Sequence, residues 1–135
     1  MLVRDTMDKL VSTLTGEHRL YHALELMEEK NIRHVPIVDE ADLLVGIISD
    51  RDIKRQLSAA YDTDKESASD RLLMLRRLSE FMTTEVVTVA PSDSVRRAAA
   101  CMLEERISAV PVLDGGGHVC GILTTTDILR LFLSS

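Results

Sequence analysis

The sequence predicts an α/β (α+β) fold made of two β-α-β-β-α repeats that pack around a pseudo-twofold axis. Residues 7–55 can be laid on residues 82–130 at a constant offset of 75 residues without a gap, and identical residues recur along that alignment. Within each copy, short β-branched stretches alternate with stretches in which apolar residues have helical spacing. One such unit leaves an apolar sheet face and an apolar helix stripe uncovered, so we expect two units to pack together.

The first copy predicts its elements in the order strand, helix, strand, strand, helix. The stretch VSTLT is short and β-branched, EHRLYHALELMEEK has helical spacing, and HVPIVD and LLVGIIS indicate two strands joined by the turn EAD. The stretch DRDIKRQL then closes the copy as a helix. The ranges are 11–15, 17–30, 34–39, 43–49 and 50–57.

The second copy repeats this order. Residues 85–91 (EVVTVAP) predict a strand that Pro91 ends, and the helix that follows has Ser92 or Asp93 as its expected N-cap. Its apolar positions at helical spacing are Val95, Ala98, Ala99, Met102 and Leu103. Strands over 109–114 and 118–124 flank the turn GGG, and residues 125–133 predict the closing helix.

These elements place the first repeat at 1–57, a linker with a helix at 58–78, and the second repeat at 79–135. The linker begins with a polar stretch, 59–70, that predicts a mobile loop. It continues with an apolar series at helical spacing, consisting of Leu72, Leu75, Leu78 and Phe81. We expect a connecting helix whose stripe packs on the repeats, and the alternative is a helix that faces a partner or a second copy.

Composition restricts the class of protein. The chain is 45% hydrophobic, which is enough for a core, and it has no tryptophan. Its net charge of −6 is unlike that of proteins that bind nucleic-acid phosphates, so we expect no nucleic-acid partner. No apolar run approaches the roughly 20 residues of a membrane span, and no secretory signal is present. We therefore expect a cytoplasmic protein whose cysteines, Cys101 and Cys120, are reduced and buried.

Two short motifs, GIISDRD (46–52) and GILTTTD (121–127), share one pattern of Gly, two aliphatic residues, Ser or Thr, two residues and Asp. The structural interpretation is a capping box at a helix start, formed by Ser49 with Asp52 and by Thr124 with Asp127. The functional interpretation adds a ligand. A helix N-terminus suits phosphate, a carboxylate can accept both hydroxyl protons of a sugar diol, and the Gly lets a base approach the strand.

The strands IRHVPIVD and ISAVPVLD, together with the two motifs, resemble the cystathionine-beta-synthase (CBS) domain in the tandem arrangement called a Bateman module. The pattern is closest to stand-alone CBS proteins of the acetoin-utilisation type. The resemblance implies a sensor that binds AMP, ADP, ATP or S-adenosylmethionine in the cleft between the repeats. It needs no cofactor, although magnesium can accompany ATP.

The resemblance also implies roles for individual residues. The ribose-binding acids fall on Asp52 and Asp127, and the hydroxyls fall on Ser49 and Thr124. Arg51 and Thr126 stand at a position that often faces phosphate, and a basic position before the Val-Pro strand falls on Arg33 and His34. The second copy has Ser108 and Ala109 there, so we expect two unequal sites, the first of which binds a phosphate tail better. His34 should make that affinity rise as the pH falls through its pKa.

Three classes of function follow from these observations. The first is a regulatory binding module that signals to an unidentified protein in trans, expected as a homodimer because the family pairs through its helices. The second is a scaffold that dimerises without a ligand. The third is an enzyme, which we do not expect because no nucleophile–base pair is present. His18 and His22 have a spacing that can bind a metal, but an ordinary helix surface offers the same, and we expect no metal site.

Overall fold

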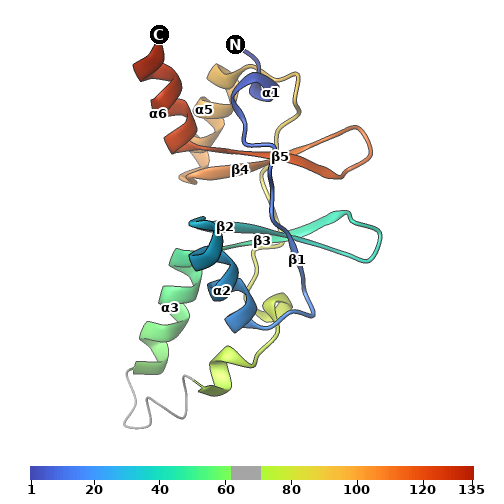
Figure 1. Ribbon diagram of the computed structural model, residues 1–135, viewed down its shortest axis with the longest axis vertical. Coiled ribbons are helices and arrows are strands. Elements are labelled where there is room, and N and C mark those ends of the chain that lie inside the picture. The colour runs from blue at the N-terminus through green and yellow to red at the C-terminus, as the bar shows by residue number, and fades with distance from the viewer. Residues whose placement is uncertain (62–70) are drawn as a thin grey trace. The chain divides into compact units, whose positions relative to one another are not determined.

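The structure is a computed structural model that describes residues 1–61 and 71–135, with the side chains of residues 58–61 left out (Figure 1). Mixed helices and strands confirm the predicted α+β class. The elements in chain order are α1 (Val3–Thr6), β1 (Leu14–Thr15), α2 (Leu20–Lys30), β2 (His34–Val38), β3 (Leu44–Ser49), α3 (Asp50–Tyr61), the 3-10 helix η1 (Leu78–Glu80), α5 (Val95–Glu105), β4 (Ala109–Leu113), β5 (Val119–Thr124) and α6 (Thr125–Ser134).

The chain forms two compact units. The first-copy unit contains residues 12–41 and 45–85, and the second-copy unit contains residues 1–11, 42–44 and 86–135. Each unit therefore includes the segment that precedes the other copy in sequence. We call these the leading segments: residues 76–85 in the first-copy unit and residues 1–11 in the second-copy unit. The predicted ranges 1–57, 58–78 and 79–135 remain a prediction about the sequence repeats, and the compact units cross them.

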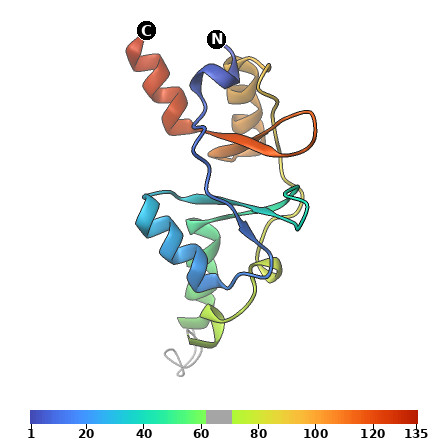
Figure 2. The ribbon, with the colours of Figure 1, turned by 45° about the vertical axis from the view of Figure 1, so that its right-hand side comes forward.

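The first-copy unit holds a three-stranded sheet in the order β1-β2-β3, with β1 parallel to β2 and Leu14 opposite Ile37. Helices α2 and α3 lie on the same side of β2 and β3 (Figures 1 and 2). The buried core of this unit is aliphatic, as the composition indicated, and consists of Leu20, Ala23, Met27, Val35, Ile37, Ile48, Ile53, Leu73 and Leu78. Burying each of the larger side chains stabilises the fold by about 1.5–3 kcal/mol.

The second-copy unit is built on the antiparallel pair β4-β5, in which Pro111 lies opposite Ile122. The strand predicted over 85–91 is wrong in extent. Within this range only Val89 pairs with β4, as an isolated parallel bridge to Val112. The Val89 N–H donates to the Pro111 carbonyl, and the Val89 carbonyl accepts the N–H of Leu113. This bridge still matches the Leu14–Ile37 pair at the offset of the repeat.

Helix α5 begins later than its sequence pattern indicated. Ser94 is the N-cap, and its Oγ accepts the N–H of Arg97 at 3.0 Å. The predicted caps, Ser92 and Asp93, are therefore wrong, because the Asp93 carboxylate instead accepts the N–H of Ala90 at 2.8 Å and closes the preceding turn. The predicted apolar stripe is only partly correct, since Leu103 is 81% exposed.

Each unit holds its leading segment through a close approach to a strand glycine. Thr83 pairs with Ile47 in the first-copy unit, and Asp8 pairs with Ile122 in the second-copy unit. A Cβ at Gly46 would lie 2.6 Å from the Met82 sulfur, and one at Gly121 would lie 2.9 Å from Met7 Cγ. The two glycines are thus required by the packing of the leading segments.

The connecting helix predicted around Leu72 is wrong in its register. Residues 71–74 are helical, but the chain then turns and leads through a bridge at Arg77 into η1. Leu73 and Leu78 are buried, whereas Leu72 is 68% exposed and Leu75 56% exposed. Helix α3 continues to Tyr61, past the predicted end at 57, and residues 62–70 of the predicted mobile loop lie outside the described residues.

Candidate functional site

The corner where β3 meets α3 is a reciprocal cap in the first-copy unit. The Ser49 hydroxyl accepts the N–H of Asp52 at 3.1 Å, and the Asp52 carboxylate accepts the N–H of Ser49 at 3.0 Å. The second carboxylate oxygen of Asp52 lies 4.0 Å from the Arg55 guanidinium, which is largely exposed. One oxygen of Asp52 therefore holds the cap and the other is directed to a weak surface contact.

The corner between β5 and α6 has the same geometry. Thr124 Oγ1 accepts the N–H of Asp127 at 3.2 Å, and Asp127 Oδ2 accepts the N–H of Thr124 at 2.8 Å. The capping-box interpretation is confirmed at both motifs. Asp52 and Asp127 are both half-buried, so each carboxylate retains access to solvent.

Each corner is tied to the residue that precedes the Val-Pro strand. The first N–H of α3, from Asp50, donates to the carbonyl of Arg33 at 2.9 Å, and the N–H of Thr125 donates to the carbonyl of Ser108 at the same distance. This bond satisfies one of the free N–H groups of a helix start. It brings the predicted residues Arg33 and His34 to the same corner as Ser49, Arg51 and Asp52. In the other unit it brings Ser108 to Thr124, Thr126 and Asp127.

The first corner is charged, and the charges act on His34. Burial lowers the pKa of His34 below 6.5, the carboxylates of Asp50 and Asp52 oppose that shift, and the guanidinium groups of Arg33 and Arg51 add to it. His34 is half-buried, whereas Arg33 and Arg51 are exposed. At neutral pH the imidazole is therefore uncharged, and the positive charge that faces solvent is carried by the two arginines.

Asp50 is a site residue that the sequence pattern did not single out. Its carboxylate acts on His34 and lies 3.6 Å from the Lys54 ammonium group. Its place in the first helical turn was visible in the sequence, but only the bond to Arg33 brings it to β2. The second corner has Thr125 in place of this acid, and Ser108 and Thr126 in place of the two arginines.

The other candidate residues have structural contacts. Nδ1 of His18 accepts the N–H of Thr15 at 3.0 Å, and Nδ1 of His22 accepts the N–H of Arg19 at 2.9 Å. No cluster of three or more potential metal ligands occurs among the residues that the structure describes. Both cysteines are unpaired and half-buried, and burial raises the pKa of the Cys120 thiol.

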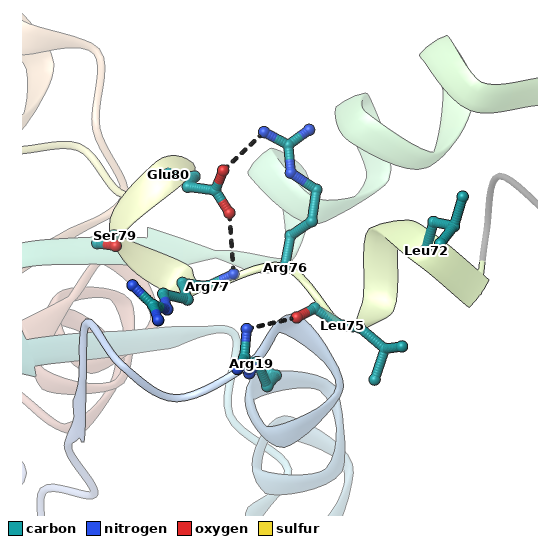
Figure 3. Close-up of a pocket in the computed structure, with 7 residues that line it drawn as sticks. All are labelled: Arg19, Leu72, Leu75, Arg76, Arg77, Ser79 and Glu80. Atoms are coloured by element: carbon teal, nitrogen blue, oxygen red, sulfur yellow. Dashed lines mark hydrogen bonds and ion pairs between the residues drawn. The ribbon is translucent and has the colours of Figure 1, made fainter.

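An open pocket of about 440 Å³ lies elsewhere in the first-copy unit, around the residues labelled in Figure 3. Two interactions join residues of its lining: Arg76 forms an ion pair with Glu80 at 2.8 Å, and the Arg19 guanidinium donates to the carbonyl of Leu75 at 2.9 Å. None of the predicted site residues lines this pocket. Within the described part of the chain, no helix is long and apolar enough to cross a membrane.

A search against protein-family models matches the CBS domain twice, over residues 3–59 and 78–134. The chain is also 35% identical over 131 residues to an L-aspartate semialdehyde sulfurtransferase of Methanocaldococcus jannaschii, of which it spans only 23%. The chain thus corresponds to about a quarter of the length of the first curated relatives that it matches.

Solved structures match over the full chain. The CBS domain pair of protein MJ0100, in complex with 5′-methylthioadenosine and S-adenosyl-L-methionine, has a TM-score of 0.84 at 34% identity and covers 99% of this chain and 97% of its own. A Vibrio cholerae protein assigned to acetoin utilization has a TM-score of 0.80 at 34% identity, with 99% and 91% covered. CBSX2 in complex with AMP has a TM-score of 0.79 at 27% identity, with 98% and 96% covered.

Proposed function

Because the chain belongs to the CBS domain family and carries two CBS domains in tandem, we propose that it is a regulatory module that binds adenosine-containing ligands. The ligand binds at the duplicated corners, and its binding signals to a separate protein in trans. This extends the resemblance seen in the strands and corner motifs, which the family match confirms.

The observation that carries this proposal is the duplicated corner. Two unrelated helix starts in one chain would not share a Ser or Thr cap, a reciprocal Asp and a tie to the residue before the Val-Pro strand. MJ0100 and CBSX2, whose solved structures match this chain over nearly its full length, were solved with 5′-methylthioadenosine, S-adenosyl-L-methionine or AMP. The shared scaffold supports a shared class of ligand.

The chemistry of each corner fits a nucleoside. One oxygen of Asp52 or Asp127 keeps the helix cap, and the other accepts hydroxyl protons of a ribose. The hydroxyl of Ser49 or Thr124 adds a further polar contact. The positive end of the helix dipole favours a phosphate group beside the first turn.

The two corners differ in charge, and we propose that they select different ligands. Arg33 and Arg51 favour a phosphate tail at the first corner, where His34 acts as a neutral hydrogen-bond partner at pH 7. The second corner has Ser108 and Thr126 in the equivalent places, which suits an adenosine ligand without a phosphate tail. AMP, ADP or ATP, the last with magnesium, then fit the first site, and S-adenosylmethionine fits the second.

The proposed module has no catalytic role of its own. The relatives named as enzymes are about four times longer than this chain, so their chemistry is assigned to no residue here. We place the protein in the cytoplasm, where adenine nucleotides are abundant, with no nucleic-acid or membrane partner.

We further propose that the module is a homodimer. Helix α6 exposes Leu129, Phe132 and Leu133 at 62, 74 and 80%, and α5 exposes Leu103 at 81%. Apolar residues gathered on helices in this way mark interaction sites. The alternative function, a dimerising scaffold without a ligand, is favoured by the same residues.

The test of the nucleotide proposal replaces Asp52 and Asp127 by Asn. The Asn side-chain oxygen can still accept the cap N–H, but the carboxylate charge is lost. We expect Asp52→Asn/Asp127→Asn to remain folded and to lose AMP, ATP and S-adenosylmethionine binding by calorimetry. Glu29→Gln/Glu104→Gln is the matched control, because it removes two exposed acids at equivalent positions of the two repeats, outside both corners.

A second readout separates the sensor from the scaffold. A ligand at a hundredfold excess over its Kd stabilises the folded state by about 2.7 kcal/mol, which raises the Tm by several degrees. Native mass spectrometry of the purified protein reports any nucleotide retained and its stoichiometry. Unchanged melting with every adenosine ligand at millimolar concentration would leave the scaffold as the function.

A further inference from the structure

The turn before the first long helix of each repeat is closed by a different side chain in the two units. In the first-copy unit, the N–H of Thr15 donates to Nδ1 of His18 at 3.0 Å. In the second-copy unit, the N–H of Ala90 donates to a carboxylate oxygen of Asp93 at 2.8 Å. These positions are equivalent at the offset of the repeat, so an imidazole in one unit and a carboxylate in the other accept the same backbone N–H.

The same turns hold the leading segments. The carbonyl of His18 accepts the N–H of Leu78 at 2.8 Å, and the carbonyl of Asp93 accepts the N–H of Val3 at 2.8 Å. One residue further on, the carbonyls of Gly16 and Pro91 accept the equivalent N–H groups of Ser79 and Arg4, at 3.1 and 3.0 Å. The two units therefore grip their leading segments through matching bonds, and these bonds depend on the shape of the turn.

A second histidine accompanies the first. Nδ1 of His22 accepts the N–H of Arg19 at 2.9 Å, and its ring centroid lies 5.1 Å from that of His18, edge to face. The Tyr21 ring lies 4.1 Å from that of His22. Because Nδ1 is the acceptor in both rings, the proton of each neutral ring is on Nε2.

We propose that His18 and His22 make the hold of the first-copy unit on residues 76–80 weaken as the pH falls, while the matching hold of the second-copy unit does not respond. An imidazole takes up a proton between about pH 5 and 8. Nδ1 then becomes a donor. The Thr15 hydroxyl, 3.0 Å away, can turn to accept that proton, but the Thr15 N–H loses its acceptor. Two adjacent imidazolium rings also repel each other.

The charged groups around the rings are carboxylates and guanidinium groups. Glu17, in the turn, lies 3.5 Å from the Arg77 guanidinium on the leading segment. Arg76 pairs with Glu80, and the Arg19 guanidinium donates to the Leu75 carbonyl (Figure 3). Carboxylates and guanidinium groups do not titrate between about pH 5 and 8. Imidazole is therefore the side-chain type at this contact that can take up a proton in this range.

The effect is local to one unit. Residues 75–80 supply most of the lining of the pocket in Figure 3, so loosening them changes that surface. The inference does not depend on nucleotide binding, because neither histidine belongs to the two corners.

The test is amide hydrogen exchange, followed by NMR on the full chain between about pH 7.5 and 5.5, above the ordinary range of carboxyl titration. Thr15 and Leu78 report on the first-copy unit, and Ala90 and Val3 are their matched internal controls. After correction for intrinsic exchange, we expect Thr15 and Leu78 to lose about tenfold in protection relative to Ala90 and Val3, as a lost cap bond implies.

Two variants assign the effect. His18→Asp installs the side chain of the other unit and should abolish the difference. His118→Asn removes an imidazole that belongs to neither the turn nor the corners, and it should leave the difference intact. Equal pH responses at the two pairs of amides in the wild-type chain would overturn the inference, and so would loss of the difference in His118→Asn. The wild-type comparison decides the matter even where His18→Asp does not fold.

Discussion

At the scale of the residue, each corner depends on one carboxylate. Asp52 and Asp127 hold helix caps with one oxygen, which the sequence motif predicted, and in the proposed function the second oxygen accepts hydroxyl protons of a ribose. The charge of the first corner is set by its neighbours, because Arg33, Arg51 and Asp50 all act on His34. The repeat alone did not reveal that His34 is held neutral.

The neutral state of His34 makes the stability of the protein depend on pH. Its pKa is below 6.5 in the folded state, so the unfolded chain binds more protons as the pH falls below that value. The contribution of His34 is complete above pH 6.5 and is lost as the pH falls toward the lowered pKa. When the pH is lowered from about 7.5 to 5.5, we expect the free energy of unfolding, measured with urea, to fall less in His34→Asn than in the wild-type protein.

The unequal corners predict an unequal response to matched mutations. Arg33→Ala removes a charge from the first corner, whereas Ser108→Ala changes the equivalent position of the second. We expect Arg33→Ala to weaken ATP binding by about 1.5–3 kcal/mol, measured by calorimetry, and Ser108→Ala to leave it unchanged. Equal ATP affinity in the wild type and Arg33→Ala would contradict the assignment of the phosphate tail to the first corner.

At the scale of the element, the leading segments explain residues that the motif had assigned to a ligand. Gly46 and Gly121 were predicted to admit a base, but the structure places Met82 and Met7 against them. The close approach is required in both units, which is why Gly and Met recur together in the repeat. Strand β1 and the bridge at Val89 are shorter than predicted because only one or two residues of each reach the neighbouring strand.

This packing predicts the cost of adding a methyl group. Gly46→Ala would place a Cβ 2.6 Å from the Met82 sulfur and 3.1 Å from the Thr83 carbonyl oxygen, so we expect a destabilisation of about 1–3 kcal/mol. Gly121→Ala should behave similarly. Gly115→Ala is the control, since nothing lies within 4 Å of its Cβ, and a change within about 0.5 kcal/mol is expected. Equal unfolding midpoints for all three variants would refute the packing argument.

At the scale of the whole molecule, the proposed dimer follows from the exposed apolar residues of α6. Leu133→Lys puts a charge among them, while Ser134→Lys puts the same charge on the adjacent exposed residue. We expect sedimentation to give a dimer for the wild type and Ser134→Lys and the 15.0 kDa monomer for Leu133→Lys. A dimeric Leu133→Lys would place the interface elsewhere.

The sequence by itself determined the duplication, the α+β class, the order of the elements and the two capping boxes. These depend on local spacing and on side chains within a few residues of one another, which a linear pattern records. Only the tertiary structure decided that residues 1–11 and 76–85 pack with the other copy, that Leu73 rather than Leu72 is buried, and that Asp50 acts on His34. These depend on which distant backbone groups find partners, and burial, which sets both core membership and the pKa of His34, exists only once the chain has folded.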